Sequence, residues 1–530
     1  MMQDKYISVK EKNKYYKNIS DLQIKIHNEK FIQKKEKEYK NYFNNMFKDV
    51  DNNIKLDHEQ IKAILTDEDY EMIIAGAGSG KTTTITGKVK YLVEKLKIKP
   101  EEIIIISYTN EAVNELRTRV NKEFKIPTNI YTFHKFCLDI IKLKKKVKVL
   151  SDNTYIFKNY FKENKLYYKN YLKHHNLKKY IRFLINKKVL SDDLDLCINF
   201  LNLFRTNNYN SFLNLIEKYQ KDKKIYSFIL LIQDIYNYYN NFLMFHKLID
   251  FDGMIIECIK LLDEINLNYK YLIIDEYQDI SHLRFKLISK IANLTDIKII
   301  VVGDDFQSIY SFSGSDISLF VNFEKLMGYA SILKITNTYR NSQELITIIG
   351  KFIMKNPSQI RKDLFSFKYL KNPIILMSYR NDKIKKLEKI ILNIIEEYGN
   401  KKSILILGRY TYDINFISNS DKFDCNNKNK IIYKHEPKLN IVYMTIHASK
   451  GLGFDNVIII NNENGVYGFP TKVKDNKYLK IIKQNSDNFS FSEERRLFYV
   501  AITRTKNRVY LLYPKLRPST FIKEIKQIIN

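Results

Sequence analysis

Short runs of Ile, Leu and Val, each followed by a polar or glycine-containing turn and then a helix-like stretch, are the feature that most constrains this sequence. One series occupies residues 72–74, 103–106, 271–274 and 299–302, and a second occupies residues 374–377, 404–407, 441–444, 457–460 and 509–512. Continuous apolar runs of this length are typical of parallel strands covered by helices on both faces. We therefore predict an α/β protein with two tandem parallel-sheet domains.

Two regions outside these series have a helical character. Residues 1–55 are rich in Lys and Glu and contain neither Gly nor Pro. Within residues 141–249, apolar side chains recur at the spacing of an amphipathic helix, as in Ile225, Phe228, Ile229, Ile232 and Tyr236. The predicted order is an N-terminal helical extension (1–55), a first sheet domain (56–140 and 250–328), a helical insertion within it (141–249) and a second sheet domain (329–530).

The charge balance favours a polyanionic partner. The 530 residues include 89 Lys and Arg against 59 Asp and Glu, a formal net charge of +30. An A+T-rich genome offers a competing explanation, because Ile, Asn and Tyr are abundant together with Lys. Residues 141–190 carry fifteen Lys or Arg side chains and only two acidic ones, with tyrosines between them. This run predicts nucleic-acid contact, although a solvated helical face has the same pattern.

The cysteines and the N-terminal segment bear on the compartment. Four cysteines are far apart and form no C-x-x-C pair, which is typical of a reducing environment and argues against a zinc module. The first residues contain no apolar segment of the secretory type, and no stretch has the composition of a membrane span. We predict an intracellular, cytoplasmic protein that does not bind a membrane.

The segment AGAGSGKT at residues 75–82 follows the first apolar run and precedes a helix-like stretch. Its glycines allow backbone N–H groups to surround phosphates at the positive end of the new helix. In this pattern Lys81 reaches the β- and γ-phosphates and Thr82 binds Mg²⁺. The predicted nucleotide-binding residues here are Ala75, Gly76, Ala77, Gly78, Ser79, Gly80, Lys81, Thr82 and Thr83.

A site for a magnesium-bound nucleotide also needs carboxylates at the end of a neighbouring strand. The segment YLIIDEYQD provides Asp275 for the metal and Glu276 to position and deprotonate an attacking water. Two adjacent acids after an apolar run are also compatible with a simple strand end in solvent. Their occurrence together with Lys81 favours the catalytic interpretation.

The chain from residue 56 to residue 512 resembles the superfamily 1 helicases of the UvrD/Rep type, and among them most closely the helicase IV branch. Besides the two motifs above, seven segments match in the order of that family. They are LDHEQIKAI (56–64), SYTNEAVNELRTR (107–119) with TFHKF (132–136), VGDDFQSIYSFSGS (302–315), TYR (338–340), TIHASKGLGFDNV (445–457) and EERRLFYVAITR (493–504).

The resemblance implies two RecA-like domains with ATP and Mg²⁺ in the cleft between them, and 3′→5′ movement on single-stranded DNA. It also implies a γ-phosphate sensor, Gln307, an arginine that meets the γ-phosphate, Arg340, and an arginine finger, Arg504. The predicted catalytic residues are Lys81, Asp275, Glu276, Gln307, Arg340 and Arg504, and the predicted metal ligands are Thr82 and Asp275. Single-stranded DNA and duplex DNA with a 3′ tail are the expected partners.

By the same resemblance, Gln60 reads the adenine, Tyr339 stacks on it, and Arg340 completes the nucleotide site. Gln60 also lies three residues after Asp57, where it could merely complete a capping box at a helix start.

The resemblance also assigns residues to single-stranded DNA. They are Tyr108, Thr109, Asn110, Thr132, His134, Tyr310, Phe312, Thr445 and His447. For Tyr108, Tyr310 and Phe312 the alternative is a place in the hydrophobic core, and for His134 it is that of an ordinary packed histidine.

The sequence departs from the family pattern at three positions. Ser313 stands where Arg is frequent, although the helicase IV branch also tends to have Ser; Glu111 replaces a basic residue, and Gly453 replaces an acid. The last difference bears on the coupling of hydrolysis to strand movement. The 105 residues from Arg340 to Thr445 are needed for the strands of the second domain, so we expect no large accessory insertion there, and the 26 residues after Arg504 are too few for a fused nuclease.

Two other functions are compatible with the same motifs. One is a nucleotide-gated protein that binds DNA or remodels a polymerase without unwinding. The other is a small-molecule NTPase with no polymer partner, which single strands would not stimulate.

Overall fold

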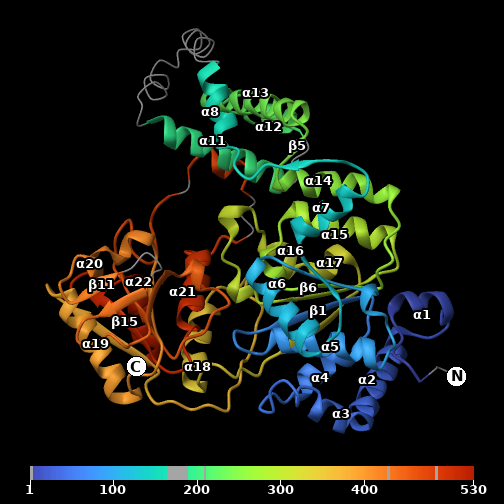
Figure 1. Cartoon of the computed structure of the whole chain (residues 1–530), viewed down its shortest axis with the longest axis horizontal. Coiled ribbons are helices and arrows are strands. Elements are labelled where there is room, and N and C mark those ends of the chain that lie inside the picture. Colours follow the sequence, from blue (N-terminus) through green and yellow to red (C-terminus); the bar gives the residue numbers. More distant parts are fainter. Residues whose placement is uncertain (1–3, 164–188, 208–210, 426–429, 475, 484–486) are drawn as a thin grey trace.

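The computed structural model describes residues 4–163, 189–207, 211–425, 430–474, 476–483 and 487–530. Two sheet domains lie next to each other, the helical insertion lies on one side of the first, and the N-terminal helices lie on its far side (Figure 1). Within the described ranges, no helix has both the length and the apolar character needed to cross a bilayer.

The first sheet has six parallel strands in the order β3-β2-β6-β7-β1-β8. The strands are β1 (Tyr70–Ala75), β2 (Ile103–Ser107), β3 (Asn129–Thr132), β6 (Tyr271–Ile274), β7 (Lys298–Gly303) and β8 (Ser331–Ile335). The four predicted strands are confirmed. The other two, β3 and β8, are edge strands with partly exposed, mixed sequences that give no continuous apolar run.

The position of β8 changes one predicted boundary. It pairs with β1 over the whole length from Glu71 with Ser331 to Ala75 with Ile335. The first sheet therefore extends beyond residue 328, where the sequence placed its end. The boundary was set too early because β8 is a short, partly exposed edge strand, in which Lys334 interrupts the apolar residues.

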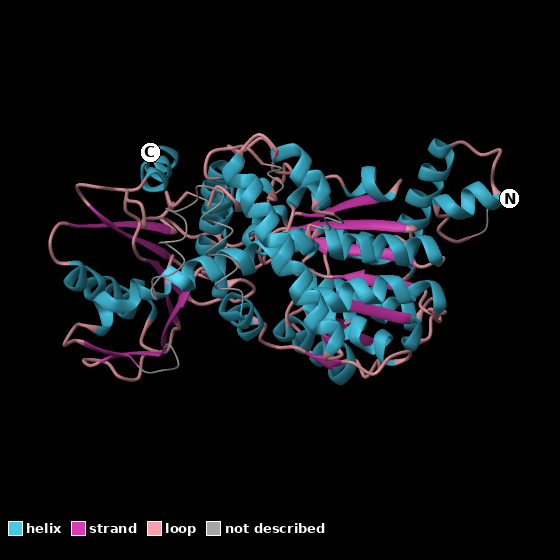
Figure 2. Ribbon diagram, turned by 90° about the horizontal axis from the view of Figure 1, so that it is seen from above, coloured by secondary structure: helices cyan, strands magenta, loops and turns pink. Residues whose placement is uncertain are grey.

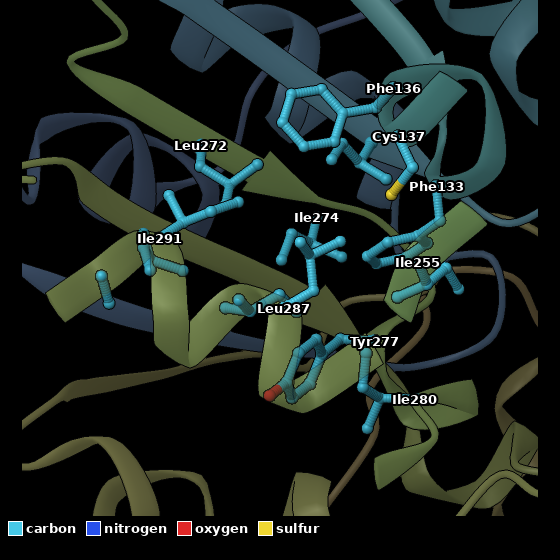
Figure 3. Close-up of a cluster of buried hydrophobic side chains, with 14 of the residues drawn as sticks. Phe133, Phe136, Cys137, Ile255, Leu272, Ile274, Tyr277, Ile280, Leu287 and Ile291 are labelled. Atoms are coloured by element: carbon cyan, nitrogen blue, oxygen red, sulfur yellow. The ribbon is translucent and has the colours of Figure 1, made fainter. Parts of the chain in front are cut away.

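Helices cover both faces of the first sheet, as Figure 2 shows from above. They are α4 (His58–Leu65), α5 (Lys81–Glu94), α6 (Asn110–Arg117), α7 (Phe133–Lys142), α14 (Phe251–Leu261), α15 (His282–Leu294), α16 (Ile317–Val321) and α17 (Phe323–Met327). In β6, Leu272 and Ile274 belong to the cluster drawn in Figure 3, whereas Tyr271 and Ile273 belong to the cluster on the other face. Burial on both faces explains the unbroken apolar run.

The second sheet has seven strands in the order β11-β12-β13-β10-β14-β15-β9. They are β9 (Ile374–Tyr379), β10 (Ile404–Gly408), β11 (Phe423–Cys425), β12 (Lys430–Tyr433), β13 (Ile441–Thr445), β14 (Asn456–Ile459) and β15 (Val509–Pro514). Its helices are α18 (Gln343–Ile353), α19 (Lys383–Tyr398), α20 (Asn415–Ser418), α21 (Ser492–Ile502) and α22 (Thr520–Ile529). The five predicted strands are confirmed and parallel, but β11 and β12 add an antiparallel edge that was not predicted.

The insertion begins and ends with two short parallel strands, β4 (Lys148–Val149) and β5 (Leu248–Ile249). Its described helices are α8 (Thr154–Glu163), α11 (Val189–Thr206), α12 (Leu213–Tyr219) and α13 (Lys223–Phe245). A buried ion pair between Arg205 and Asp250 attaches α11 to the first turn of α14. Most of the basic run at residues 141–190 lies outside the described residues, so its predicted contact with nucleic acid stays a prediction.

The N-terminal extension consists of α1 (Val9–Tyr15), α2 (Asp21–Glu38) and α3 (Lys40–Asn45). Apolar side chains of the extension, including Phe31 and Phe43, pack against α4 and α5. The backbone N–H of Val9 donates to Glu68 at 2.8 Å, and that of Lys10 donates to Asp69 at 2.7 Å. The extension is thus fixed to the segment that enters β1.

Candidate functional site

The phosphate-binding loop connects the end of β1 to the start of α5, as the sequence predicted. Gly78 and Gly80 have φ angles of +73° and +82°, which favour glycine. A Cβ atom on Gly78 would lie 2.5 Å from the Cβ of Arg340, so this position also lacks room for a side chain. Ser79 Oγ donates to the Gly76 carbonyl at 2.9 Å, and α5 begins at Lys81 with its N–H groups directed at the loop.

The acid pair lies at the end of β6, beside the loop. Glu276 has φ +53°, a conformation that costs a non-glycine residue about 1–2 kcal/mol. Its carboxylate contacts Lys81 Nζ at 3.0 Å and Lys450 Nζ at 3.6 Å. Burial alone would raise the pKa of Glu276, but these two cations hold the pKa below its usual range. Glu276 is therefore ionised, with both lysines in contact with its carboxylate.

Asp275 has the opposite shift. Burial and the adjacent charge of Glu276 raise its pKa to about 7. One more cation at this point would favour the ionised form of Asp275. The Asp275 carboxylate and the Thr82 hydroxyl are oxygen ligands of the kind that Mg²⁺ prefers. Both residues border the same cavity of about 460 Å³. The residues present fit a magnesium ion.

The second domain closes the other side of this cavity with Arg340 and Arg504. Arg504 is only 1% exposed, and its Nη2 donates to Gln307 Oε1 at 3.1 Å. Further donation to the carbonyls of Val500 and Leu452 fixes the guanidinium. Burial, together with the nearby charge of Arg340, lowers the pKa of Arg504 to about 9. Two arginines that border one cavity, where the charge of Arg340 lowers the affinity of Arg504 for its proton, favour an anion between them.

Two lysines that the sequence analysis did not select belong to the same network. Lys450 Nζ pairs with Asp279 and donates to the Gln307 carbonyl at 2.8 Å. Lys362 pairs with Asp304, and Asp304 in turn accepts from Gln307 Nε2 at 2.7 Å. Lys362 comes from a segment of low apolar periodicity, so only the structure shows that it pairs with Asp304.

The predicted adenine side brings Gln60 and Tyr339 together around Asp57. Asp57 and Gln60 form the capping box of α4, while Gln60 Nε2 also donates to the Ser79 carbonyl at 3.0 Å. The Tyr339 hydroxyl donates to Asp57 at 2.8 Å, and the Tyr339 ring is 51% exposed. The capping alternative for Gln60 is thus confirmed, and contact with adenine stays a prediction.

The residues predicted to contact DNA divide into three groups. Tyr108, Thr109 and Tyr310 border the nucleotide cavity. His134 and Phe312 border a cavity between the first domain and the insertion, and Phe312 and His447 border a larger one toward the second domain. The hydroxyls of Thr132 and Thr445 accept from backbone N–H groups of Lys135 and Ala448, and Asn110 is an exposed residue at the start of α6.

The aromatic residues among them differ in burial. Tyr108 packs against Phe133 and under Arg284 with its hydroxyl buried, as the core alternative predicted. Phe312 is 57% exposed and lies next to His447, with ring centroids 5.6 Å apart. Burial lowers the pKa of His134 and of His447 to about 4, so both imidazoles are neutral at pH 7. Among these aromatic residues, Phe312 has the exposed ring that base stacking requires.

A nucleotide cavity shared by two parallel-sheet domains defines the class of protein, a P-loop nucleotide hydrolase with tandem domains. The profile of the UvrD/REP helicase N-terminal domain matches residues 56–328. The chain belongs to the UvrD/REP helicase family.

Three relatives illustrate the similarity. DNA helicase IV of Escherichia coli K12 is 26% identical over 97% of this chain and 75% of its own length. The ATP-dependent DNA helicase Rep of Buchnera aphidicola (Acyrthosiphon pisum) is 27% identical over 86% of this chain and 71% of its own. A probable DNA helicase II homologue of Mycoplasma capricolum is 30% identical over 64% of this chain and 48% of its own. The resemblance to the helicase IV and Rep proteins is thereby confirmed.

Proposed function

We propose that this protein hydrolyses Mg-ATP between its two sheet domains and uses the cycle to move 3′→5′ along single-stranded DNA, unwinding duplexes that carry a 3′ tail. The name of each relative above contains the words DNA helicase, and Rep is named as ATP-dependent. The direction of movement rests on the family resemblance of the motifs.

The contact of Arg504 with Gln307 is the observation that carries the proposal. It joins Arg504, two residues after the end of α21 in the second domain, to the loop after β7 of the first, at 3.1 Å. Gln307 lies on the same short loop as Phe312, five residues earlier in the chain. A change at the γ-phosphate would therefore alter both the domain contact and the position of the proposed stacking ring.

Each charged group has a distinct role in this proposal. Lys81 binds the β- and γ-phosphates, and Glu276, freed from Lys81, orients the attacking water and accepts its proton. Thr82 and Asp275 would hold Mg²⁺, which would supply positive charge to neutralise the phosphate oxygens. Arg340 and Arg504 neutralise the charge that develops in the transition state.

Duplexes with a 3′ tail or a 5′ tail, assayed together with ATP hydrolysis, test the proposal. We expect unwinding of the 3′-tailed duplex only, and hydrolysis stimulated by single strands. Stimulated hydrolysis without unwinding of either duplex would favour the remodelling ATPase. Hydrolysis that single strands do not stimulate would favour a small-molecule NTPase.

One observation favours the remodelling alternative. A Cβ on Gly453 would lie 3.3 Å from Arg340 Nε, so an acid at this position would meet that guanidinium directly. With glycine here, Arg340 lacks that restraint on its orientation. The test is to restore the acid in Gly453→Glu and to measure the base pairs unwound per ATP. A gain indicates loose coupling in the natural chain and favours the remodelling alternative. No change indicates that the acid is dispensable for unwinding, so that Gly453 does not favour this alternative.

The intracellular location that the cysteines indicate stays a prediction. Three of the four cysteines are buried, and Cys425 is partly exposed.

A further inference from the structure

A segment of the second domain packs into the core of the helical insertion. Residues 476–483, which we call the strap, contain a short 3-10 turn (Leu479–Ile481) and bury Tyr478 and Ile482 among the insertion helices. The Tyr478 ring stacks on Phe228 of α13, with centroids 4.3 Å apart. In Figure 1 this red segment extends away from its own sheet to α11.

A polar contact supports the same junction. Asn207, just after α11, donates from Nδ2 to the Ile482 carbonyl at 2.7 Å, and Asn207 is buried. The junction therefore combines apolar burial with a satisfied buried amide, as stable contacts do. It links the second domain to the insertion, whereas α21 links the second domain to the first.

Two residues of α21 form hydrogen bonds with the loop after β7. Glu493 accepts hydrogen bonds from the Ser311 backbone N–H and hydroxyl, and Arg496 Nε donates to the Ser308 carbonyl at 2.7 Å. Both Ser308 and Ser311 precede Phe312 in the loop after β7.

A cavity of about 810 Å³ lies between the two links. Asn207 and Lys480 of the strap junction border it, and so do Ser311 and Glu493 of the α21 link. Phe312 and His447 border it as well. Since Phe312 also borders the neighbouring cavity between the first domain and the insertion, the two cavities meet at this ring.

The strap presents two different faces. Its apolar side chains are buried in the insertion, whereas Lys480 borders the cavity together with Lys474, just before the strap. Both lysines are exposed, and neither forms an ion pair in the described part of the chain. Two exposed cations that border the same cavity as an exposed aromatic ring match the phosphates and bases of a single strand.

We propose that the strap completes a closed ring around single-stranded nucleic acid, with Lys474 and Lys480 contacting its phosphates. The ring consists of the first domain, the insertion, the strap and the second domain. This inference rests on the proposed function, since it places the strand on Phe312. A linear strand can thread through such a ring by its end, but a circular strand enters only when the strap leaves the insertion.

A covalent link across the strap junction tests this directly. The full chain carries Phe228→Cys and Tyr478→Cys, with the half-exposed Cys425 replaced by Ser, and a short bifunctional thiol reagent joins the two new cysteines. When the link is made first, we expect binding to a linear single strand and loss of binding to a closed circular strand of the same sequence. When the circle is bound first, linking should hold it through a wash in about 1 M salt, where charge screening acts within about 3 Å.

Single-cysteine variants treated with the same reagent are the controls. Equal binding of circles and linear strands after prior linking, or release of the circle by the salt wash, would overturn the ring and leave the proposed function intact. Failure of the unlinked protein to bind linear strands would instead refute the proposed function, and the ring with it.

The two lysines are tested separately, in variants without added cysteines. Lys474→Ala and Lys480→Ala should each reduce the dependence of the logarithm of affinity on the logarithm of salt concentration by about 0.7 for a single strand. Lys472→Ala is the matched control, because Lys472 is exposed, close in sequence and outside the lining of the cavity. The same slope in all three variants and the natural chain would show that no phosphate lies beside the strap.

Discussion

The nucleotide cavity and the cavity beside Phe312 are both shared between domains, but they are built differently. In the first, charged groups are partly or fully buried and already have polar partners, as in the pairs of Lys81 with Glu276 and of Arg504 with Gln307. In the second, Phe312, Lys474 just before the strap and Lys480 in the strap are exposed. A preorganised site suits a reaction whose charge must be stabilised at fixed points, whereas an exposed site suits a polymer that has to slide.

The largest effect is expected from Lys81, the single cation of the loop at residues 75–82. Lys81→Ala should abolish ATP hydrolysis, because no other cation of the loop can contact the β- and γ-phosphates. Glu276→Gln should keep nucleotide binding and lose turnover. Nucleotide binding and phosphate release, measured on the same preparations, distinguish the two variants. Turnover near the natural rate in Lys81→Ala would mean that the catalytic site lies elsewhere.

The second largest effect is expected at Arg504, which joins the two sheet domains. Arg504→Ala should lower turnover by about 10³-fold or more, the scale of arginine fingers, with a much smaller loss of affinity for ATP. Because Arg504 is fully buried, Arg504→Lys serves as the control for folding, since it keeps the charge but not the donation to Gln307. An equal loss of affinity with unchanged turnover would make Arg504 a binding residue only.

The same difference between the two cavities explains how much of each could be predicted from the sequence. The nucleotide cavity is formed by contiguous motifs at strand ends, so its glycines, acids and arginines could be selected from the sequence. The second cavity combines α11, the loop after β7 and the strap, and no local pattern links Asn207 or Tyr478 to Phe312. The parallel strands were predicted from their buried runs, but edge strands such as β8 were not, because one side of them is exposed.

The third prediction concerns Phe312 in the exposed cavity. Phe312→Ala should weaken binding of single strands by about 5- to 150-fold, since stacking is worth about 1–3 kcal/mol per base. ATP hydrolysis without DNA should survive, and the salt dependence should stay unchanged because no phosphate contact is lost. Fluorescence binding titrations and a thermal melt check this. A large fall in melting temperature with loss of every activity would show that Phe312 is a core residue.

The smallest effect concerns the neutral imidazole next to Phe312. Burial, followed by the positive charges of Arg409 and Lys450, lowers the pKa of His447 to about 4 from an ordinary value near 6.5. The unfolded chain then binds a proton at higher pH than the folded chain does. The stability that His447 contributes is complete above about pH 6.5 and is lost as the pH falls toward 4.

His447→Gln, which keeps a polar group of similar size, should therefore flatten the fall in the free energy of unfolding between pH 6.5 and 4, as measured by chemical denaturation. His134 has the same shift without a contact to Lys450, so His134→Gln is the matched comparison. If single strands bring phosphates near His447, their binding should raise its pKa, and affinity for DNA should increase as the pH falls from 7 to 5 more in the natural chain than in His447→Gln. Identical pH profiles of affinity in both would mean that bound phosphates stay away from this imidazole and that His447 acts on the strand only through its position beside Phe312.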